Sequence, residues 1–218
     1  MLPRVLEPEV MDSAEEAHDY DAMDHALVNR AFVADLLALW RPSGRVLDVG
    51  TGTAQIPIEL CRQTPGVTAV AVDAARHMLA VATANIKKAG LDKRIQLQCC
   101  DAKKMPFADS SFQAVMSNSI VHHIPQPLGV LAEIKRLAAP GGTIFVRDLM
   151  RPADDQMVKH FVATYAGDAN AHQQKMFDES LRAALTLDEI RAMVQGLGFG
   201  PETVRATSDR HWTWCAVR

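Results

Sequence analysis

Short apolar segments alternate with helical patterns between residues 45 and 148. The apolar segments cover residues 45–50, 67–73, 95–101, 112–119 and 143–148. The helical patterns that separate most of them cover residues 53–62, 75–89 and 127–138. Strands that alternate with helices form parallel sheets, because each helix carries the chain back across one face of the sheet. The alternation therefore predicts an α/β fold with helices on both faces of a parallel sheet.

Helical patterns also flank this core, at residues 13–40 and 152–184. Two capping boxes, in which a Ser or Thr and a Glu three residues later bond the free N–H groups of a first turn, mark predicted helix starts. These boxes are Ser13 with Glu16 and Thr186 with Glu189. The tail, residues 203–218, predicts two strands joined at a polar corner. Because no linker separates two halves, we expect a single domain.

Composition excludes several classes of protein. The 218 residues carry a net charge of −3, with 48% hydrophobic and 22% charged residues, which is typical of an ordinary globular protein. This charge gives no attraction to nucleic acid or to an anionic membrane. The four cysteines have no CxxC or zinc-finger spacing, so we expect reduced thiols and no metal site. Without a signal pattern or an apolar run of about 18 residues, the chain is expected to be cytoplasmic.

The segment VLDVGTGTAQ, residues 46–55, predicts a glycine turn between the first strand and the next helix, where sheets of this kind bind ligands. A dinucleotide-binding turn needs the pattern G-x-G-x-x-G, but Gln55 stands at the third glycine position. Asp48 would also repel a pyrophosphate. A nicotinamide cofactor is therefore a weak hypothesis for this turn.

A cofactor with a positive centre and no phosphate fits the turn better. S-adenosylmethionine carries a sulfonium and an ammonium group, which the Asp48 carboxylate would attract. Asp73 follows the second strand, where its carboxylate can accept both ribose hydroxyls. Asp101 follows the third strand and, with Ala102, can accept from the adenine amino group. One such Asp is more often a cap or a turn residue, but three in order around a glycine turn indicate this cofactor.

The sequence resembles the class I S-adenosylmethionine-dependent methyltransferases, and most of all the small-molecule branch that includes the ubiquinone/menaquinone-biosynthesis C-methyltransferases. The resemblance runs in continuous order over about residues 44–150 and rests on four segments. These are VLDVGTGTAQ (46–55), AVDAARHML (71–79), CCDAKKMPFADSSFQAVMSNSIVHHI (99–124) and LAAPGGTIFVRD (137–148). One departure is Ala54, which stands where the family often has a third glycine.

The resemblance implies a Rossmann-like, doubly wound and mostly parallel seven-stranded sheet with an antiparallel last strand. It also implies N-terminal helices and a helical insertion after the fifth strand. Within one domain, 1–218, we expect four parts. They are an N-terminal helical flap (1–42), a cofactor-binding core (43–150), a helical lid insertion (151–185) and a last helix with a C-terminal strand hairpin (186–218).

The resemblance also assigns cofactor contacts by position. Residues of the glycine turn, namely Asp48, Gly50, Thr51 and Gly52, surround the methionine part. The ribose and adenine contacts are Asp73, Ala74, Met78, Asp101 and Ala102, and the residues under the sulfonium are Asn118 and Ser119. Tyr20, Met23 and His25 of the N-terminal helices either close over the cofactor or simply pack, and the sequence leaves both open.

Methyl transfer from a sulfonium is an in-line displacement with a good leaving group, so the protein mainly aligns the reactants and excludes water. A general base is needed only where the nucleophile must lose a proton. The candidates on the acceptor side are His123, Arg147 and Tyr165. The alternatives are a histidine that packs beside the cofactor, a salt bridge from Arg147 to Asp148, and a solvated loop around Tyr165.

The functional hypothesis is therefore an S-adenosylmethionine-dependent methyltransferase that acts on a small molecule. The alternative of another class is a non-catalytic S-adenosylmethionine-binding or scaffold protein on the same fold. We expect a small-molecule methyl acceptor as partner, no nucleic acid and no membrane insertion, and the choice between a monomer and a homodimer stays open.

Overall fold

The computed structural model of the chain describes residues 2–7, 12–23 and 25–218. Residues 1, 8–11 and 24, which belong to the predicted N-terminal flap, lie outside the described residues. The strands are β1 (Arg45–Val49), β2 (Thr68–Asp73), β3 (Ile95–Cys99), β4 (Phe112–Asn118), β5 (Ala138–Leu149), β6 (Val204–Ala206) and β7 (His211–Val217). The helices are α1 (Ala14–Ala22), α2 (Ala26–Leu39), α3 (Gln55–Gln63), α4 (Arg76–Lys88), η1 (Val121–His123), α5 (Leu128–Leu137), α6 (Asp155–Tyr165), α7 (Ala171–Ala183), α8 (Leu187–Gly196) and η2 (Pro201–Thr203).

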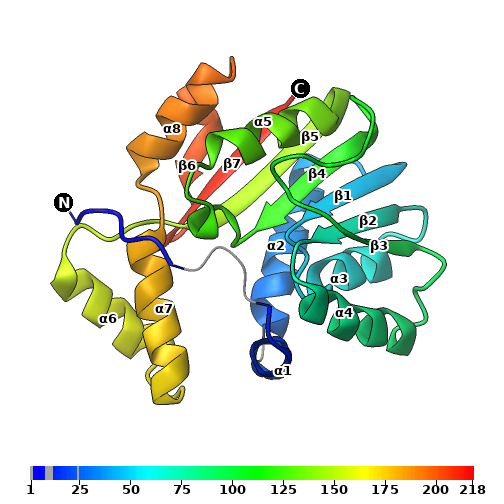
Figure 1. Cartoon of the computed structure of the whole chain (residues 1–218). Coiled ribbons are helices and arrows are strands. Elements are labelled where there is room, and N and C mark those ends of the chain that lie inside the picture. Colours follow the sequence, from blue (N-terminus) through cyan, green and yellow to red (C-terminus); the bar gives the residue numbers. More distant parts are fainter. Residues whose placement is uncertain (1, 8–11, 24) are drawn as a thin grey trace. The chain divides into compact units, whose positions relative to one another are not determined.

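Within the described part of the chain, seven strands form one sheet in the order β3-β2-β1-β4-β5-β7-β6 (Figure 1). β1 pairs in parallel with β2 and β4, and β2 pairs in parallel with β3. β6 and β7 form an antiparallel hairpin, in which Val204 lies opposite Trp214. The predicted fold class, a mostly parallel sheet with an antiparallel end and surrounding helices, is confirmed.

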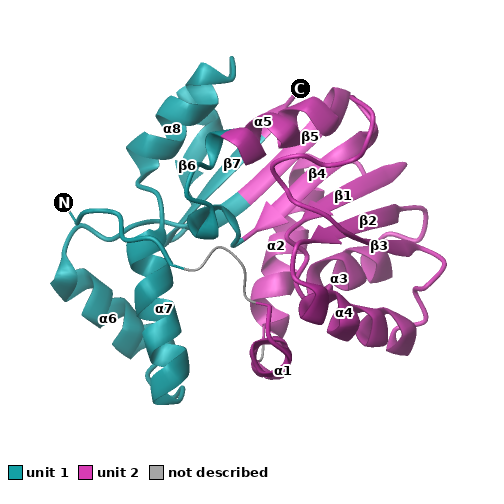
Figure 2. Cartoon of the chain, viewed as in Figure 1, with its two compact units in different colours: residues 1–9, 119–128, 147–215 teal, residues 10–118, 129–146, 216–218 magenta. Residues whose placement is uncertain are grey.

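The chain divides into two compact units (Figure 2). Unit 1 consists of Met1–Glu9, Ser119–Leu128 and Arg147–Cys215, and unit 2 consists of Val10–Asn118, Gly129–Val146 and Ala216–Arg218. Unit 2 contains β1 to β4 and the glycine turn. Unit 1 contains α6 to α8, β6, β7 as far as Cys215 and the loop that follows β4. The organisation as one domain with four parts remains a prediction.

Both predicted capping boxes are present. The Ser13 hydroxyl accepts from the Glu16 N–H while the Glu16 carboxylate accepts from the Ser13 N–H, and Thr186 and Glu189 exchange the same two bonds. Each box satisfies backbone donors that a helix start leaves free, so α1 and α8 begin where the sequence places them.

The fifth strand starts earlier than predicted. The apolar segment predicts a strand at 143–148, whereas β5 already begins at Ala138. The Gly141 N–H donates to the Arg218 carbonyl at 2.8 Å, and the Arg218 N–H donates to the Gly142 carbonyl at 3.0 Å. Pairing with Arg218 thus extends the strand in front of the predicted segment.

The turn after β1 contains left-handed residues at alternate positions. Gly50 has φ +75°, Gly52 has φ +53° and Ala54 has φ +63°. The first two are glycines, which adopt this conformation without steric cost, whereas Ala54 bears a Cβ that opposes it. The Ala54 methyl is fully buried in an apolar cluster with Ile58, among others, and this burial offsets the backbone cost.

We expect a smaller and a larger side chain at Ala54 to change the stability of the fold by very different amounts. Ala54→Gly relieves a left-handed strain of about 1–2 kcal/mol and loses about 0.8 kcal/mol of methyl burial, so its stability should stay within about 1 kcal/mol of wild type. Ala54→Val places a branched side chain at positive φ in a packed core and should cost at least about 2 kcal/mol. Urea unfolding of the three proteins measures both changes, and a Val variant as stable as wild type would contradict this account of the turn.

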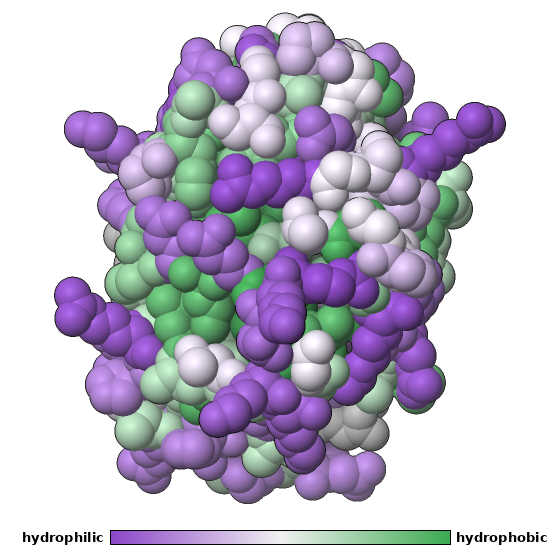
Figure 3. Space-filling view, turned by 90° about the vertical axis from the view of Figure 1, so that its right-hand side faces the viewer, coloured by the Kyte–Doolittle hydropathy of each residue, from purple (hydrophilic) through white to green (hydrophobic). Residues whose placement is uncertain are grey.

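An open apolar pocket lies on α4 and β3 of unit 2, lined by Thr83, Ile86, Lys87, Asp92, Ile95 and Leu97. Figure 3, which views the molecule from the right-hand side of Figure 1, shows apolar patches bordered by hydrophilic side chains. None of the lining residues belongs to the predicted cofactor contacts.

No helix within the described ranges is both long and apolar enough to cross a bilayer.

Candidate cofactor site

Two carboxylates meet at the carboxyl edge of β1 and β2. Because these strands are parallel, Asp48 near the end of β1 and Asp73 at the end of β2 reach the same edge of the sheet. The Gly50 and Thr51 N–H groups both donate to the Val72 carbonyl at 2.9 Å, which fixes the glycine turn above the sheet.

Asp48 is almost completely buried, with 2% of its surface exposed. Its Oδ2 atom has no hydrogen-bond partner among the described residues. Burial, opposed by the Thr51 hydroxyl and reinforced by the charge of Asp73, raises the pKa of Asp48 to about 7. An ionised carboxylate at this depth requires a compensating charge, so the position favours a cationic ligand.

Asp73 holds the glycine turn as well as the end of β2. Its Oδ2 accepts from the Gly52 N–H at 2.8 Å, and its Oδ1 accepts from the Ala75 N–H at 2.9 Å. Burial raises the pKa of Asp73, although these backbone bonds oppose the rise. Each carboxylate oxygen can accept further bonds, so the pair of oxygens stays suited to two ligand hydroxyls.

Helix α1 places an aromatic ring beside the glycine turn. Tyr20 Cε1 lies 3.6 Å from the position that a Cβ atom on Gly52 would take. Tyr20 also packs on the buried cluster of Ala17, Ala75 and Met78. Burial, followed by the charges of Asp73 and other carboxylates, raises the pKa of Tyr20 to about 12, so the hydroxyl stays protonated. Tyr20 therefore packs within unit 2 and borders the candidate site, and its closing over the cofactor stays a prediction.

Gln55 has a structural reason to occupy the position where a dinucleotide site would have glycine. Its side-chain oxygen accepts from Asn29 of α2 at 3.0 Å, and its amide donates to Asp21 of α1 at 3.0 Å. Asp21 in turn accepts from Asn85 of α4 at 2.8 Å. These hydrogen bonds connect the N-terminal helices α1 and α2 to α3, the helix that follows the glycine turn.

The other predicted contacts of unit 2 lie near strand ends. Met78 is buried on α4, and Ala74 follows Asp73 directly. Asp101 is exposed two residues after β3, and its Oδ1 accepts from the Lys103 N–H at 2.8 Å. Ala102 follows it, half-buried. These positions are compatible with the predicted adenine contacts, which stay a prediction.

Asn118 ends β4, beside β1. Ser119, the next residue, adopts φ +59° and donates its N–H to the Arg147 carbonyl at 2.9 Å within unit 1. A left-handed non-glycine residue at a strand end is uncommon and often marks a functional turn. The contact of these two residues with a sulfonium stays a prediction.

In unit 1, His122 and Asp148 form a buried ion pair close to the left-handed Ser119. His122 Nδ1 lies 2.5 Å from Asp148 Oδ1, and Asp148 also accepts from the N–H groups of Val121, His122 and Leu149. Burial lowers the pKa of His122, but the Asp148 charge outweighs it, and the pKa is raised overall. Burial likewise raises the pKa of Asp148, and the His122 charge and the hydrogen bonds bring it below its usual value.

The three acceptor-side candidates occupy separate surroundings in unit 1. His123 Nδ1 lies 3.1 Å from Glu7 Oε1. Arg147 donates from Nε to the Thr213 hydroxyl at 3.0 Å. Tyr165 donates to Asp209, and the Arg210 guanidinium lies 3.3 Å from the centre of its ring. Their catalytic roles stay predictions.

Sequence reasoning missed two partners in this unit. Glu7, far away in the sequence, contacts both histidines, and Asp148 bonds His122 rather than acting only as a strand-end residue. No spacing in the sequence indicates the contact of Glu7 with the histidines. An Asp at the end of the fifth strand and a His-His pair after the fourth strand, in contrast, could have indicated the contact between Asp148 and His122.

Comparison with known proteins gives the same assignment. The family model for the methyltransferase domain matches residues 47–146. The demethylmenaquinone methyltransferase of Thermus thermophilus is 30% identical over 205 residues, which cover 85% of this chain and 90% of that protein. The ubiquinone/menaquinone biosynthesis C-methyltransferase of Desulfotalea psychrophila is 35% identical over 123 residues, which cover 56% of this chain. This chain spans 48% of the latter, about half the length of that relative.

A solved structure agrees in fold. The S-adenosylmethionine-dependent methyltransferase from Aquifex aeolicus superposes with a TM-score of 0.68 at 17% identity, covering 95% of this chain and 99% of that one. The sequence match with the Thermus thermophilus protein covers more than two thirds of both chains, at 30% identity. The chain belongs to the class I S-adenosylmethionine-dependent methyltransferases.

Proposed function

We propose that the chain transfers a methyl group from S-adenosylmethionine to a small-molecule acceptor by in-line displacement. The observation that carries the proposal is the buried Asp48 carboxylate, whose Oδ2 lacks a hydrogen-bond partner among the described residues, beside Asp73 at the sheet edge. Two carboxylates under a glycine turn suit a ligand that has both a positive charge and vicinal hydroxyls.

The proposal keeps the cofactor roles that the family resemblance implies. Asp48 and the turn residues Gly50, Thr51 and Gly52 receive the methionine part, and Asp73 receives the ribose. Ala74, Met78, Asp101 and Ala102 surround the adenine, and Asn118 with Ser119 lies at the sulfonium. Tyr20 closes the turn from α1, because its ring lies against Gly52. The protein thereby holds the methyl group in place while the acceptor attacks.

The acceptor side is assigned to His123, Arg147 and Tyr165. Arg147 would bind an acidic or oxygen-rich acceptor, and His123 would take a proton where the nucleophile carries one. One relative is named a demethylmenaquinone methyltransferase, and another is named for ubiquinone/menaquinone biosynthesis. In our proposal, the acceptor of this chain belongs to the same broad class of small molecules. The proposal also includes a cytoplasmic location. It leaves open whether the chain is a monomer or a homodimer.

The pH dependence of cofactor binding follows from Asp48. Its pKa of about 7 is raised above the unfolded value near 3.8, so ionisation of the buried carboxylate weakens the ligand-free fold as pH rises toward 7. A cationic ligand binds the ionised form, so S-adenosylmethionine affinity should increase as pH rises, by up to about tenfold per unit below pH 7, and level off above it. Asp73 and Tyr20, which face the same turn, are the other titratable groups involved.

Calorimetric titration with S-adenosylmethionine between pH 5.5 and pH 8.5 tests this expectation. Asp48→Asn is the matched variant, because it removes the titrating group and keeps its size. The variant should bind more weakly at pH 8, and its affinity should vary little with pH. An equally steep pH profile in the variant would show that another group, or the ligand itself, is responsible.

A release assay for S-adenosylhomocysteine separates the enzyme from the non-catalytic alternative. With candidate acceptors such as reduced demethylated quinones, an enzyme releases S-adenosylhomocysteine in proportion to the acceptor. A protein that binds the cofactor tightly and releases none with any acceptor would favour the scaffold hypothesis.

A further inference from the structure

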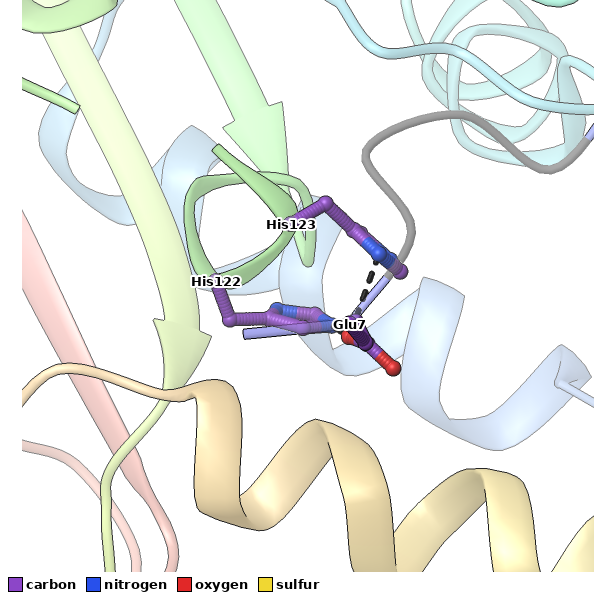
Figure 4. A group of neighbouring side chains, drawn as sticks. All are labelled: Glu7, His122 and His123. Atoms are coloured by element: carbon purple, nitrogen blue, oxygen red, sulfur yellow. Dashed lines mark ion pairs between the residues drawn. The ribbon is translucent and has the colours of Figure 1, made fainter. Parts of the chain in front are cut away.

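Three potential ligand atoms converge in unit 1. Glu7 from the N-terminal segment and the neighbouring His122 and His123 from η1 each offer one atom, and these atoms lie within 4.8 Å of one another (Figure 4). Glu7 Oε1 is 3.4 Å from His122 Nε2 and 3.1 Å from His123 Nδ1. In a tetrahedral ion with bonds of about 2.0–2.2 Å, ligand atoms are about 3.3–3.6 Å apart, so both distances are close to those of a coordination sphere.

The Glu7 carboxylate is buried without a full set of partners. Its side chain is 10% exposed, and Oε1 has no hydrogen-bond partner among the described residues although two imidazole nitrogens lie near it. Its other oxygen, Oε2, accepts from the Ser180 hydroxyl at 3.2 Å. A buried carboxylate oxygen without a hydrogen bond is costly, and a bound cation removes that cost.

The Asp148 carboxylate also holds His122 in the way that histidine ligands of metal ions are held. Asp148 Oδ1 lies 2.5 Å from His122 Nδ1, which places the proton on Nδ1 and leaves Nε2 as the ligand atom toward Glu7. Such a carboxylate–histidine pair is the usual outer partner of a bound metal ion. The centroids of the two imidazole rings are 4.1 Å apart, so both rings lie beside the same Glu7 carboxylate.

The segment that carries Glu7 is anchored. The Arg4 guanidinium donates to the carbonyl groups of Ala183, His122 and Ile124 at 2.6, 3.0 and 2.9 Å. This anchoring holds Glu7 over η1. Among the described residues, the charges that act on His122 are the carboxylates of Asp148 and Glu7 and the guanidinium of Arg4, so negative charge predominates there and favours a cation.

We propose that Glu7, His122 and His123 form a binding site for a divalent transition-metal ion, with Asp148 and Ser180 as its outer partners. Two imidazoles and one carboxylate suit Zn²⁺ or a related transition-metal ion and not Mg²⁺ or Ca²⁺, which prefer oxygen ligands. Three protein ligands leave a fourth position for water or another small ligand. A metal ion on Nδ1 of His123 excludes the proton-accepting role assigned to this ring under the proposed function, so the metal site and that role are alternatives at His123. The proposal does not rest on the proposed methyl transfer.

Zn²⁺ titration of the chelator-treated full chain, followed by calorimetry, tests the site. Because Cys99 is exposed and adjacent to Cys100, the Cys99→Ser/Cys100→Ser protein without an affinity tag serves as the background. We expect a single Zn²⁺ site with a dissociation constant in the micromolar range or below. Glu7→Gln and His123→Gln should each weaken binding by more than the about 10–100-fold that loss of an outer partner costs. His77→Gln, at an exposed histidine of unit 2, is the control and should bind like the background.

Co²⁺ provides the spectroscopic measurement. A four-coordinate Co²⁺ ion with nitrogen and oxygen ligands gives an intense visible absorption without the near-ultraviolet band of a thiolate ligand. We expect this spectrum in the background protein and its loss in Glu7→Gln and His123→Gln, with circular dichroism confirming that both variants fold. Absence of Zn²⁺ binding at millimolar concentration, or undiminished binding in both variants, would overturn the proposal and leave an ordinary ion-pair cluster.

Discussion

Asp73→Ala is expected to weaken S-adenosylmethionine binding by at least about 100-fold, because two charge-assisted hydrogen bonds to the ribose hydroxyls are worth about 1.5–3 kcal/mol each. Asp73 lies at the end of β2 and is partly buried beside the glycine turn. Calorimetry measures the change. Asp92→Ala, an exposed turn position in the same unit, is the matched control and should bind like wild type.

The same substitution also removes the acceptor for the N–H groups of Gly52 and Ala75, so a weaker affinity could come from a loosened turn. A cofactor analogue that lacks both ribose hydroxyls separates the two causes. If Asp73 binds the ribose, the analogue binds the wild-type chain much more weakly than the cofactor does. Asp73→Ala already lacks the bonds to the ribose hydroxyls, so it should bind the analogue almost as well as it binds the cofactor. Equal losses for both proteins would show that Asp73 acts on the turn and not on the ribose.

Asp148→Ala is expected to destabilise the fold by about 3–5 kcal/mol, the cost of breaking a buried ion pair. The substitution leaves the buried His122 imidazole and the backbone N–H groups of Val121, His122 and Leu149 without their acceptor. Urea unfolding in a buffer with a chelator measures the free energy of unfolding independently of any metal ion.

Two further variants test whether the lost stability comes from the Asp148 carboxylate. Asp148→Asn keeps the size and one acceptor oxygen, so it should cost less than Asp148→Ala. Asp168→Ala, at an exposed position of the same unit, should stay within about 0.5 kcal/mol of wild type. An Asp148→Ala protein within about 1 kcal/mol of wild type would contradict the assignment of this carboxylate as the anchor of η1.

The fold was predictable because its signals are local. Alternating strands and helices define a parallel sheet, and in such a sheet the carboxyl ends of neighbouring strands share one edge. The convergence of Asp48 and Asp73 therefore follows from their positions at the ends of β1 and β2. The capping boxes at Ser13 and Thr186 are equally local, since each needs only a residue three positions away.

The remaining features depend on partners that are distant in the sequence. β5 begins at Ala138 because the chain end at Arg218 pairs with it, which no spacing reveals. Tyr20 reaches Gly52 only through the packing of α1. The contacts of Glu7 with the two histidines join segments without any shared motif, so the metal site that we propose was invisible to a search for Cys and His spacing.

The central claim is that the turn after β1 receives S-adenosylmethionine or its product. Calorimetric titration of the purified chain with S-adenosylhomocysteine, and with NADH in the same buffer, tests it most directly. We expect a single site for S-adenosylhomocysteine with micromolar affinity and no heat with NADH. Binding of NADH, or no binding of S-adenosylhomocysteine at millimolar concentration, would contradict the claim.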